Sequence, residues 1–435
     1  MSPADIQEKI REYLPVKEAE KNKNGEVFTP QSLIEEMLNK LPTSIWENPK
    51  LKWLDPANGV GNFPMIVFQK LNEGLKNVRG YKTDKKRKQH IIKNMLYMVE
   101  LNPMNVAVSK KIFGEDANIY CGSFLEDGWK DAFGVDFFDV VLGNPPYNNG
   151  GVRSHTGLRL GEKNETIWPK FIEKLFKLLK PDGFLVFITP LSWLKKSHSL
   201  HNEMLEKHIA WLKLWDNDKS LETIKGKIPI SLYVLQNTPN TTNKKTDIIS
   251  EIQSKKLTTT STEYLNPAYS IPLAFHSIFN KLIQFIEKNN CSLEYKTKTI
   301  KSSGTKEKIP TEYTLEDMWA VDTYTIKEGI IVKKATQQHP DADKRKLIIA
   351  NKIGFKGAFI DDGKLSLTGN HKFYILGDNL ELIKKILSFK ISSVVSEYTK
   401  YGQSFLDKEA FTYIPDLRKM GIQDITEDEF YKLLG

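Results

Sequence analysis

The stretch LKWLDPANGVGNFP, residues 51–64, decides the fold that we expect for this chain. It begins with a short apolar strand, continues with a carboxylate at Asp55 and glycines at Gly59 and Gly61, and leads into a helix from about Phe63. Doubly wound α/β sheets bind nucleotides at such a glycine turn, because the following helix presents free N–H groups there. The stretch therefore predicts a Rossmann-like α/β domain, although a two-glycine turn alone is often only a connection.

Two carboxylates indicate which ligand this turn would bind. Asp55 would repel a pyrophosphate but attract the amino group of a zwitterionic amino acid, which favours S-adenosylmethionine over NAD. Glu100 ends the second strand, where a carboxylate commonly accepts hydrogen bonds from both ribose hydroxyls. The basic stretch from Lys76 to His90 lies between turn and acid, and we interpret it as an exposed insertion.

From about Leu51 to Gln236, apolar strand-like runs alternate with helical patterns, which is typical of a parallel sheet with crossover helices. We count seven strands, namely LKWLDP at Leu51, LYMVE at Leu96, NIYCG at Asn118, FDVVLGNP at Phe138, GFLVFITP at Gly183, WLKLWD at Trp211 and PISLYVLQ at Pro229. The stretch WPKFIEKLFKLLK from Trp168 spaces its apolar residues along one face of a helix. The polar run NTPNTTNKKTD from Asn237 indicates a connection, so we place a domain boundary near residue 240.

The part of the chain after this boundary predicts a second, mixed α/β domain. The dipeptide Asp362-Gly363 is flanked by strand formers and suits a tight hairpin turn. The stretch NLELIKKILSFKISSVV from Asn379 spaces its apolar residues helically. HPDADKRK from His339 is interpreted as a solvated charged loop.

The composition excludes several classes of protein. With 40% apolar and 27% charged residues among 435, the chain is predicted to fold, and no apolar run approaches the length of a membrane-spanning helix. The start of the sequence does not resemble a secretory signal peptide, so we expect a cytoplasmic or DNA-associated location. The net charge of +9 makes nucleic acid a candidate partner.

No metal site is expected. Two cysteines form neither a disulfide framework nor a four-thiolate zinc site. His198, His201 and His208 lie in an amphipathic stretch without neighbouring cysteines, and we interpret them as exposed helix positions.

The stretch FDVVLGNPPYN places Asn144, Pro145, Pro146 and Tyr147 directly after the fourth strand. Two prolines cannot continue a sheet and restrict the residue before them, so the asparagine amide and the adjoining carbonyl are expected to be held rigidly. Two acceptors that hold both N–H bonds of a planar amine draw its nitrogen toward tetrahedral geometry and free its lone pair for attack. The ring of Tyr147 is expected to stack on the aromatic ring that carries this amine. It would stabilise the positive charge that develops on that ring.

Taken together, NGEVFTP at Asn24, the glycine turn, the acid in MVELNP and NPPY resemble the gamma class of adenine-N6 DNA methyltransferases of restriction–modification systems. The order of the motifs carries this resemblance, because only 83 positions (144 − 61) separate Gly61 from Asn144 and leave no room there for a recognition domain. The resemblance covers residues 24–236 well. It implies a helical arm at residues 1–23, a seven-stranded methyltransferase domain at 24–240 and a target-recognition domain at 241–435.

The resemblance also implies roles for individual residues, with S-adenosylmethionine as cofactor and duplex DNA as substrate. The expected catalytic residues are Asn144, Pro145, Pro146 and Tyr147. The expected cofactor-binding residues are Phe28, Thr29, Pro30, Asp55, Pro56, Ala57, Gly59, Gly61, Asn62, Phe63, Glu100, Leu101, Ser123, Phe124 and Asn144. Ser123 stands where the family usually has an acid. No aromatic residue precedes the last strand, so Tyr147 either lacks a partner around a flipped base or pairs with a residue such as Trp193 or Trp215.

Other functions stay open on the sheet motifs alone. Glutamine-amide and some RNA guanine methyltransferases use a similar turn, and a cofactor-binding subunit of a larger restriction–modification complex would carry the same motifs. The large domain after the sheet favours DNA, because base flipping requires a second surface that reads sequence. Arg153 and Arg159, in the loop from Asn148 to Asn164, are expected on DNA phosphates. A companion restriction endonuclease, the recognition sequence and the oligomeric state stay undetermined.

Overall fold

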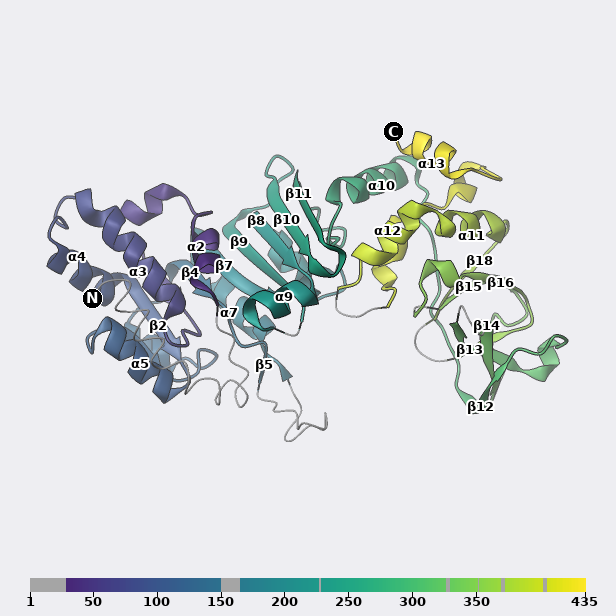
Figure 1. Ribbon diagram of the computed structural model, residues 1–435, viewed down its shortest axis with the longest axis horizontal. Coiled ribbons are helices and arrows are strands. Elements are labelled where there is room, and N and C mark those ends of the chain that lie inside the picture. Colours follow the sequence, from purple (N-terminus) through teal and green to yellow (C-terminus); the bar gives the residue numbers. More distant parts are fainter. Residues whose placement is uncertain are drawn as a thin grey trace. The chain divides into compact units, whose positions relative to one another are not determined.

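The structure is a computed structural model, and it divides into two compact units (Figure 1). Unit 1 runs to Trp193 and continues over Ser197–Pro267, whereas unit 2 comprises Leu194–Lys196 and Ala268–Gly435. The boundary that we expected near residue 240 therefore lies inside unit 1.

The structure describes residues 29–149, 165–226, 228–325, 329–350, 352–368, 372–401 and 405–435. The expected helical arm at residues 1–23 lies outside these ranges, as do three predicted site residues, Phe28, Arg153 and Arg159. Within the described ranges, every helix is too short or too polar to traverse a lipid bilayer.

Unit 1 is built on a nine-stranded sheet with the order β11-β10-β8-β9-β7-β4-β1-β2-β3. Its strands are β1 Trp53–Asp55, β2 Leu96–Glu100, β3 Asn118–Cys121, β4 Phe138–Gly143, β7 Leu179–Pro190, β8 Lys207–Trp215, β9 Ile230–Pro239, β10 Thr246–Ile252 and β11 Leu257–Glu263. β1 runs parallel to its neighbours β2 and β4, and β9 runs antiparallel to both β7 and β8. The seven predicted strands all occur, and the predicted α/β class is confirmed.

Two strands that we did not predict extend this sheet beyond β8. β10 pairs in parallel with β8, and β11 pairs antiparallel with β10 at the edge. The sequence LTTTSTE of β11 is polar, but threonine is β-branched and suits a half-exposed edge strand. The polar run after Gln236 is therefore the turn between β9 and β10, and it does not separate the units.

Helices cover the sheet of unit 1. They are α2 Gln31–Leu38, α3 Asn62–Gly74, α4 Asp84–His90, α5 Pro103–Phe113, α6 Gly128–Phe133, α7 Trp168–Leu178, α8 His201–Leu205 and α9 Asn217–Ile224. Shorter helical turns are η1 Thr43–Glu47, η2 Leu75–Asn77, η3 Ile91–Met95, η4 Leu191–Leu194 and η5 Gln253–Lys255, and a small hairpin joins β5 Asn148–Asn149 to β6 Glu165–Thr166. The predicted helix at Trp168 is α7, which buries Phe171, Leu175 and Leu178.

The basic stretch that we interpreted as an exposed insertion includes α4 and is mostly exposed, with one exception. Arg87 is buried, and its guanidinium donates to the carbonyls of Tyr81 and Lys82 and to the side chain of Asn72. One of its cations therefore holds the connection between α3 and β2 together.

Unit 2 contains two further sheets, with the orders β12-β14-β13-β17 and β16-β15-β18. Their strands are β12 Ser302–Lys308, β13 Trp319–Thr325, β14 Gly329–Ala335, β15 Arg345–Ala350, β16 Phe359–Asp362, β17 Ser366–Leu367 and β18 Lys372–Leu376. The helices are α10 His276–Asn289, α11 Leu380–Ser388, α12 Lys390–Tyr398 and α13 Glu427–Leu434, with helical turns η6 Leu315–Asp317, η7 Phe355–Gly357, η8 Lys408–Tyr413 and η9 Leu417–Met420. The expected helix from Asn379 is the pair α11 and α12.

Residues 194–196 belong to unit 2 although they are surrounded by unit 1 in the sequence. The ammonium group of Lys195 pairs with the carboxylate of Asp407 at 2.5 Å, and the amide of Lys196 donates to the Ser270 hydroxyl at 2.8 Å. The carbonyl of Leu194 accepts from the amide of Ile271.

The predicted hairpin at Asp362-Gly363 is wrong. β16 pairs with β15, not with β17, which belongs to the other sheet. The Asp361 carboxylate accepts from the amides of Lys364 and Leu365 and forms a fully buried ion pair with Lys346 at 2.5 Å. Because these two amides bond to Asp361, they are not available for pairing with β16. The chain therefore passes from the sheet of β16 to the sheet of β17.

HPDADKRK is not the solvated loop that we expected. His339, Asp341 and Lys346 are buried, because they form hydrogen bonds and ion pairs with neighbouring strands. His201 is likewise fully buried, and its Nδ1 hydrogen-bonds the carbonyl of Trp193, so it does not occupy an exposed helix position.

Candidate active site

The glycine turn lies between β1 and α3, as its sequence predicts. Gly59 and Gly61 have φ values of 59° and 92°, which are left-handed conformations that favour glycine. A Cβ atom at Gly61 would lie 2.8 Å from the ring of Phe113, so this position also requires the absence of a side chain. Backbone geometry and packing thus both fix the turn.

Glu100, at the end of β2, holds the turn from the neighbouring strand. Its Oε2 accepts from the Gly59 amide at 2.6 Å, and its Oε1 accepts from the Asn102 amide at 2.8 Å. The carboxylate is buried at 8% exposure. The structure therefore brings together the turn and the acid that the sequence separates by 39 positions (100 − 61).

Asp55, the last residue of β1, is a buried carboxyl group. Its Oδ1 accepts from the Ala57 amide at 3.1 Å, and it lies so close to Gly143 that a Cβ there would approach it to 3.0 Å. Burial raises the pKa of Asp55 to about 8, and the nearby charge of Glu100 acts in the same direction. No basic side chain in the described part of the chain counters this effect. A cationic group next to Asp55 would therefore favour its ionised form.

The NPPY turn follows β4 directly and meets the segment before α2. The Asn144 side-chain nitrogen donates to the hydroxyl of Thr29 at 3.4 Å, although the two residues lie 115 positions apart. The Asn144 side-chain carbonyl oxygen is buried and has no hydrogen-bond partner among the residues that the structure describes. A buried acceptor without a donor is costly, and such atoms in proteins often await a ligand.

Within the described part of the chain, the buried hydroxyl groups of Tyr147 and Tyr233 also lack hydrogen-bond partners. The hydroxyl of Tyr147 has no partner among these residues, and burial raises the pKa of this phenol. Tyr233 in β9 has the same properties, and the charge of Tyr147 contributes to its raised pKa, which shows that the two phenols are near each other. Sequence reasoning missed Tyr233. Its only signal is a tyrosine within the otherwise aliphatic strand ISLYVL.

Of the two tryptophans proposed as partners of Tyr147, Trp193 contacts Tyr233 of this pair. The Trp193 ring meets Tyr233 edge-on at 5.7 Å, and its indole N–H donates to the Ser231 hydroxyl at 2.8 Å. Trp215 instead lies at the end of β8, with the ammonium groups of Lys213 and Lys219 over its ring. The position of Trp193 is the more suitable one, but its role stays a prediction.

Two of the other predicted cofactor residues, Leu101 and Phe124, differ in their exposure to solvent. Leu101 follows Glu100 and is 71% exposed, so it offers an apolar surface next to the acid. Phe124 is buried and stacks on Trp129 and Phe171 at 5.4 and 5.3 Å, which makes it part of the packing of α6 and α7. In this arrangement, Leu101 is better placed than Phe124 to contact a ligand.

Lys213 fixes the helix that follows Thr29. This buried lysine of β8 pairs with Glu36 of α2 at 2.8 Å and with Glu251 of β10 at 2.9 Å. The position of α2, and with it the contact between Thr29 and Asn144, thus depends on a strand outside the predicted seven.

The chain is similar to several known proteins. Residues 66–221 match the family model described as Eco57I restriction-modification methylase. A Mycoplasma pneumoniae protein described as an uncharacterized adenine-specific methylase is 25% identical over 42% of this chain and 59% of its own length. The chain therefore spans about three fifths of this relative.

Two solved structures are also similar. The type IIL restriction-modification enzyme MmeI in complex with DNA aligns with 95% of this chain and 67% of its own, at 12% identity and a TM-score of 0.45. The M protein of the type I restriction enzyme EcoKI aligns with 52% of this chain and 48% of its own, at 15% identity and a TM-score of 0.37. Over residues 66–221, the resemblance to restriction–modification methylases that the motifs predict is confirmed.

Proposed function

We propose that this chain transfers a methyl group from S-adenosylmethionine to the N6 amine of adenine in duplex DNA. The observation that carries the proposal is the buried carbonyl oxygen of Asn144 at the end of β4, which has no partner within the described ranges of the chain. β4 lies beside β1, so this acceptor and the Asp55 turn emerge from adjacent parallel strands. A target amine and a bound cofactor would meet there.

The residues of the turn fit S-adenosylmethionine. Asp55 would hold the ammonium group, Glu100 would accept from the ribose hydroxyls, and Leu101 would cover the adenine ring. The cofactor supplies an electrophilic methyl group on a positively charged sulfur. The raised pKa of Asp55 supports this assignment, because an ammonium partner would compensate the cost of ionising a buried carboxyl group.

Asn144 would act on the target amine. Its side-chain N–H donates to Thr29, which fixes the amide orientation and leaves the carbonyl oxygen as acceptor for an N–H of the amine. With a backbone carbonyl of the NPPY turn holding the second N–H, the nitrogen lone pair would be freed from the ring to attack the methyl carbon, and the bond between methyl and sulfur would break as the new N–C bond forms, leaving the neutral thioether S-adenosylhomocysteine. The amine then loses one proton to solvent. The ring of Tyr147 would stabilise the positive charge that forms on the base.

Unit 2 would supply target recognition. An enzyme that flips a base needs contacts to base edges and compensation for the lost stacking, and a catalytic turn alone offers few of either. We therefore assign cofactor binding and chemistry to unit 1, and sequence reading to unit 2.

The test uses purified full-length protein and S-adenosylmethionine labelled in the methyl group. DNA, RNA and protein extracts are incubated separately, and the modified nucleoside is identified by mass spectrometry. We expect label in DNA as N6-methyladenine. Label only in RNA or protein, or in DNA as methylcytosine, would contradict the proposal. A chain that binds the cofactor but methylates nothing would instead be a subunit of a larger complex.

A matched pair of variants links this activity to the site. Asn144→Ala should remove turnover, whereas Asn94→Ala changes an exposed asparagine of the same unit and should have no effect.

A further inference from the structure

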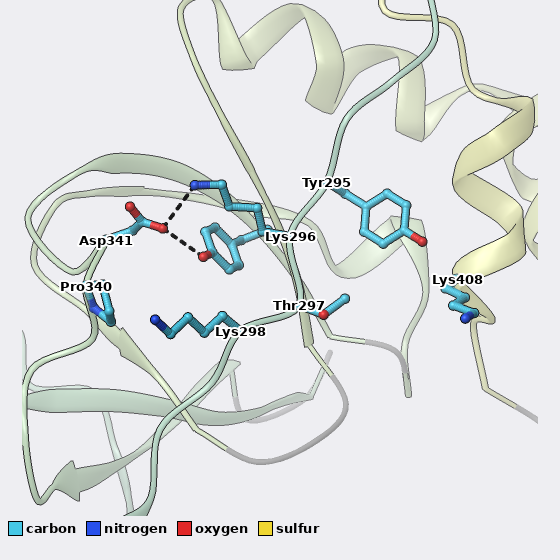
Figure 2. Close-up of a pocket in the computed structure, with 8 residues that line it drawn as sticks. Tyr295, Lys296, Thr297, Lys298, Pro340, Asp341 and Lys408 are labelled. Carbon is cyan, nitrogen blue, oxygen red and sulfur yellow. Dashed lines mark hydrogen bonds and ion pairs between the residues drawn. The ribbon is translucent and has the colours of Figure 1, made fainter.

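Unit 2 contains an open hollow of about 740 Å³ (Figure 2). Its lining residues are Tyr295, Lys296, Thr297, Lys298, Pro340, Asp341, Tyr374 and Lys408. The extended segment 295–298 crosses it, with Lys296 and Lys298 pointing to one side and Tyr295 and Thr297 to the other (Figure 2). Three of the eight lining residues are lysines.

The backbone of this segment is fixed in place. Lys296 and Tyr374 exchange backbone hydrogen bonds of 2.8 and 3.0 Å. The ring of His339 bonds the carbonyl of Lys298 through Nε2 at 2.9 Å, while its Nδ1 accepts from the Asp341 amide at 3.0 Å. This pattern requires a neutral ring with its proton on Nε2. The lysine side chains therefore project from a rigid base.

The single carboxylate of the hollow is already engaged. Asp341 pairs with Lys344 at 2.6 Å and Lys296 at 3.4 Å, and it accepts from the Tyr374 hydroxyl at 2.8 Å. These partners hold the pKa of Asp341 well below its usual range, so it stays ionised. Lys298 and Lys408 are exposed and have no carboxylate partner within the described part of the chain. The hollow thus carries an excess of positive charge.

We propose that this hollow binds phosphate groups of the DNA backbone, with the ammonium groups of Lys298 and Lys408 as the principal contacts. The hydroxyls of Tyr295 and Thr297 provide further donors of the kind that contact phosphates in protein–DNA interfaces. The inference rests on the proposed function and adds a specific division within unit 2. The hollow contributes affinity that does not depend on sequence, while other residues of the unit read bases.

The experiment compares full-length wild type with Lys298→Ala/Lys408→Ala. Fluorescence anisotropy measures the dissociation constants for two duplexes, one that contains the sequence that the enzyme methylates and one in which that sequence is scrambled. The salt concentration is varied between about 50 and 200 mM, the range over which phosphate contacts strongly affect affinity. We expect affinity to fall about five- to tenfold per lysine, equally for both duplexes, and the salt slope to fall by roughly two. The sequence preference of methylation should not change.

The control is Lys288→Ala/Lys384→Ala, which removes two exposed lysines of unit 2 outside the hollow. Its affinity and salt slope should stay close to wild type. Thermal unfolding and cofactor binding should be unchanged in both variants, which separates a lost contact from misfolding.

Three results would overturn the inference. If the hollow variant behaves like the control while wild type methylates DNA, the hollow does not hold phosphate and the proposed function stands. If the hollow variant loses affinity only for the specific duplex, these lysines read bases. If wild type neither binds nor methylates DNA, the proposed function fails, and this inference fails with it.

Discussion

Replacing Asp55 with asparagine is expected to stabilise the empty protein while weakening cofactor binding. Burial raises the pKa of Asp55 from 3.8 to about 8. Between these values the folded state holds a proton that the unfolded state has released, so the free energy of unfolding falls as pH rises through this window and levels off above it. At 1.36 kcal/mol per pKa unit, the cost at pH 8 reaches about 6 kcal/mol as an upper bound.

An amide avoids this cost and still accepts the hydrogen bond from the Ala57 amide. The Asp55→Asn variant should therefore unfold at a higher temperature than wild type at pH 8, and at nearly the same temperature at pH 4. Calorimetric unfolding at pH 4, 6 and 8 measures the difference. Asp139→Asn serves as the control, because Asp139 pairs with Lys180 and its loss should only destabilise.

Cofactor binding should show the opposite effect. An ammonium group requires ionised Asp55, so wild type should bind S-adenosylmethionine more tightly as pH rises from 6 toward 8 and should release about one proton at pH 7. Titration calorimetry in buffers of different ionisation enthalpy measures this proton. The asparagine variant should bind more weakly and release none. Two results would refute the reasoning. One is an Asp55→Asn variant that is less stable than wild type at pH 8, and the other is cofactor binding by wild type that releases no proton.

Three further predictions concern catalysis, positioning and domain boundaries. Asn144→Ala should lower the methylation rate at least about a hundredfold, with the cofactor dissociation constant within about twofold of wild type, as measured by turnover and calorimetry. Lys213→Met should destabilise the protein by about 2 kcal/mol in denaturant unfolding, and adding Glu36→Gln should recover part of the loss, because it removes a carboxylate left without its cation. A fragment ending at residue 267 should remain soluble and bind the cofactor, whereas one ending at residue 240 should aggregate because it lacks β10 and β11; chromatography and calorimetry distinguish these outcomes.

The sequence predicts the parts of the molecule in which local pattern and tertiary structure agree. Apolar runs and glycine spacing locate the seven central strands, the turn after β1 and the NPPY turn. The contact between Thr29 and Asn144 is not among these parts, because the order of the motifs does not indicate which side chains meet.

The rest depends on partners that are distant in the sequence. The threonine-rich strand β11 has the composition of a linker and becomes a strand only because β10 offers it an edge. Tyr233 is part of the site only because Tyr147 lies near it. The charged stretch at His339 is buried because Asp361, Tyr374 and the carbonyl of Lys298 supply its partners. Local sequence patterns do not predict such contacts between distant residues.

The assignment of residues 194–196 to unit 2 has a consequence for any chimera that exchanges this unit. A chimera that exchanges unit 2 at one junction after residue 267 would leave Lys195 and Lys196 behind with unit 1. The incoming unit would then lack the ion pair to Asp407 and the hydrogen bond to Ser270. A functional graft therefore needs two splice points, with the tripeptide after Trp193 transplanted from the same donor as the carboxyl-terminal segment.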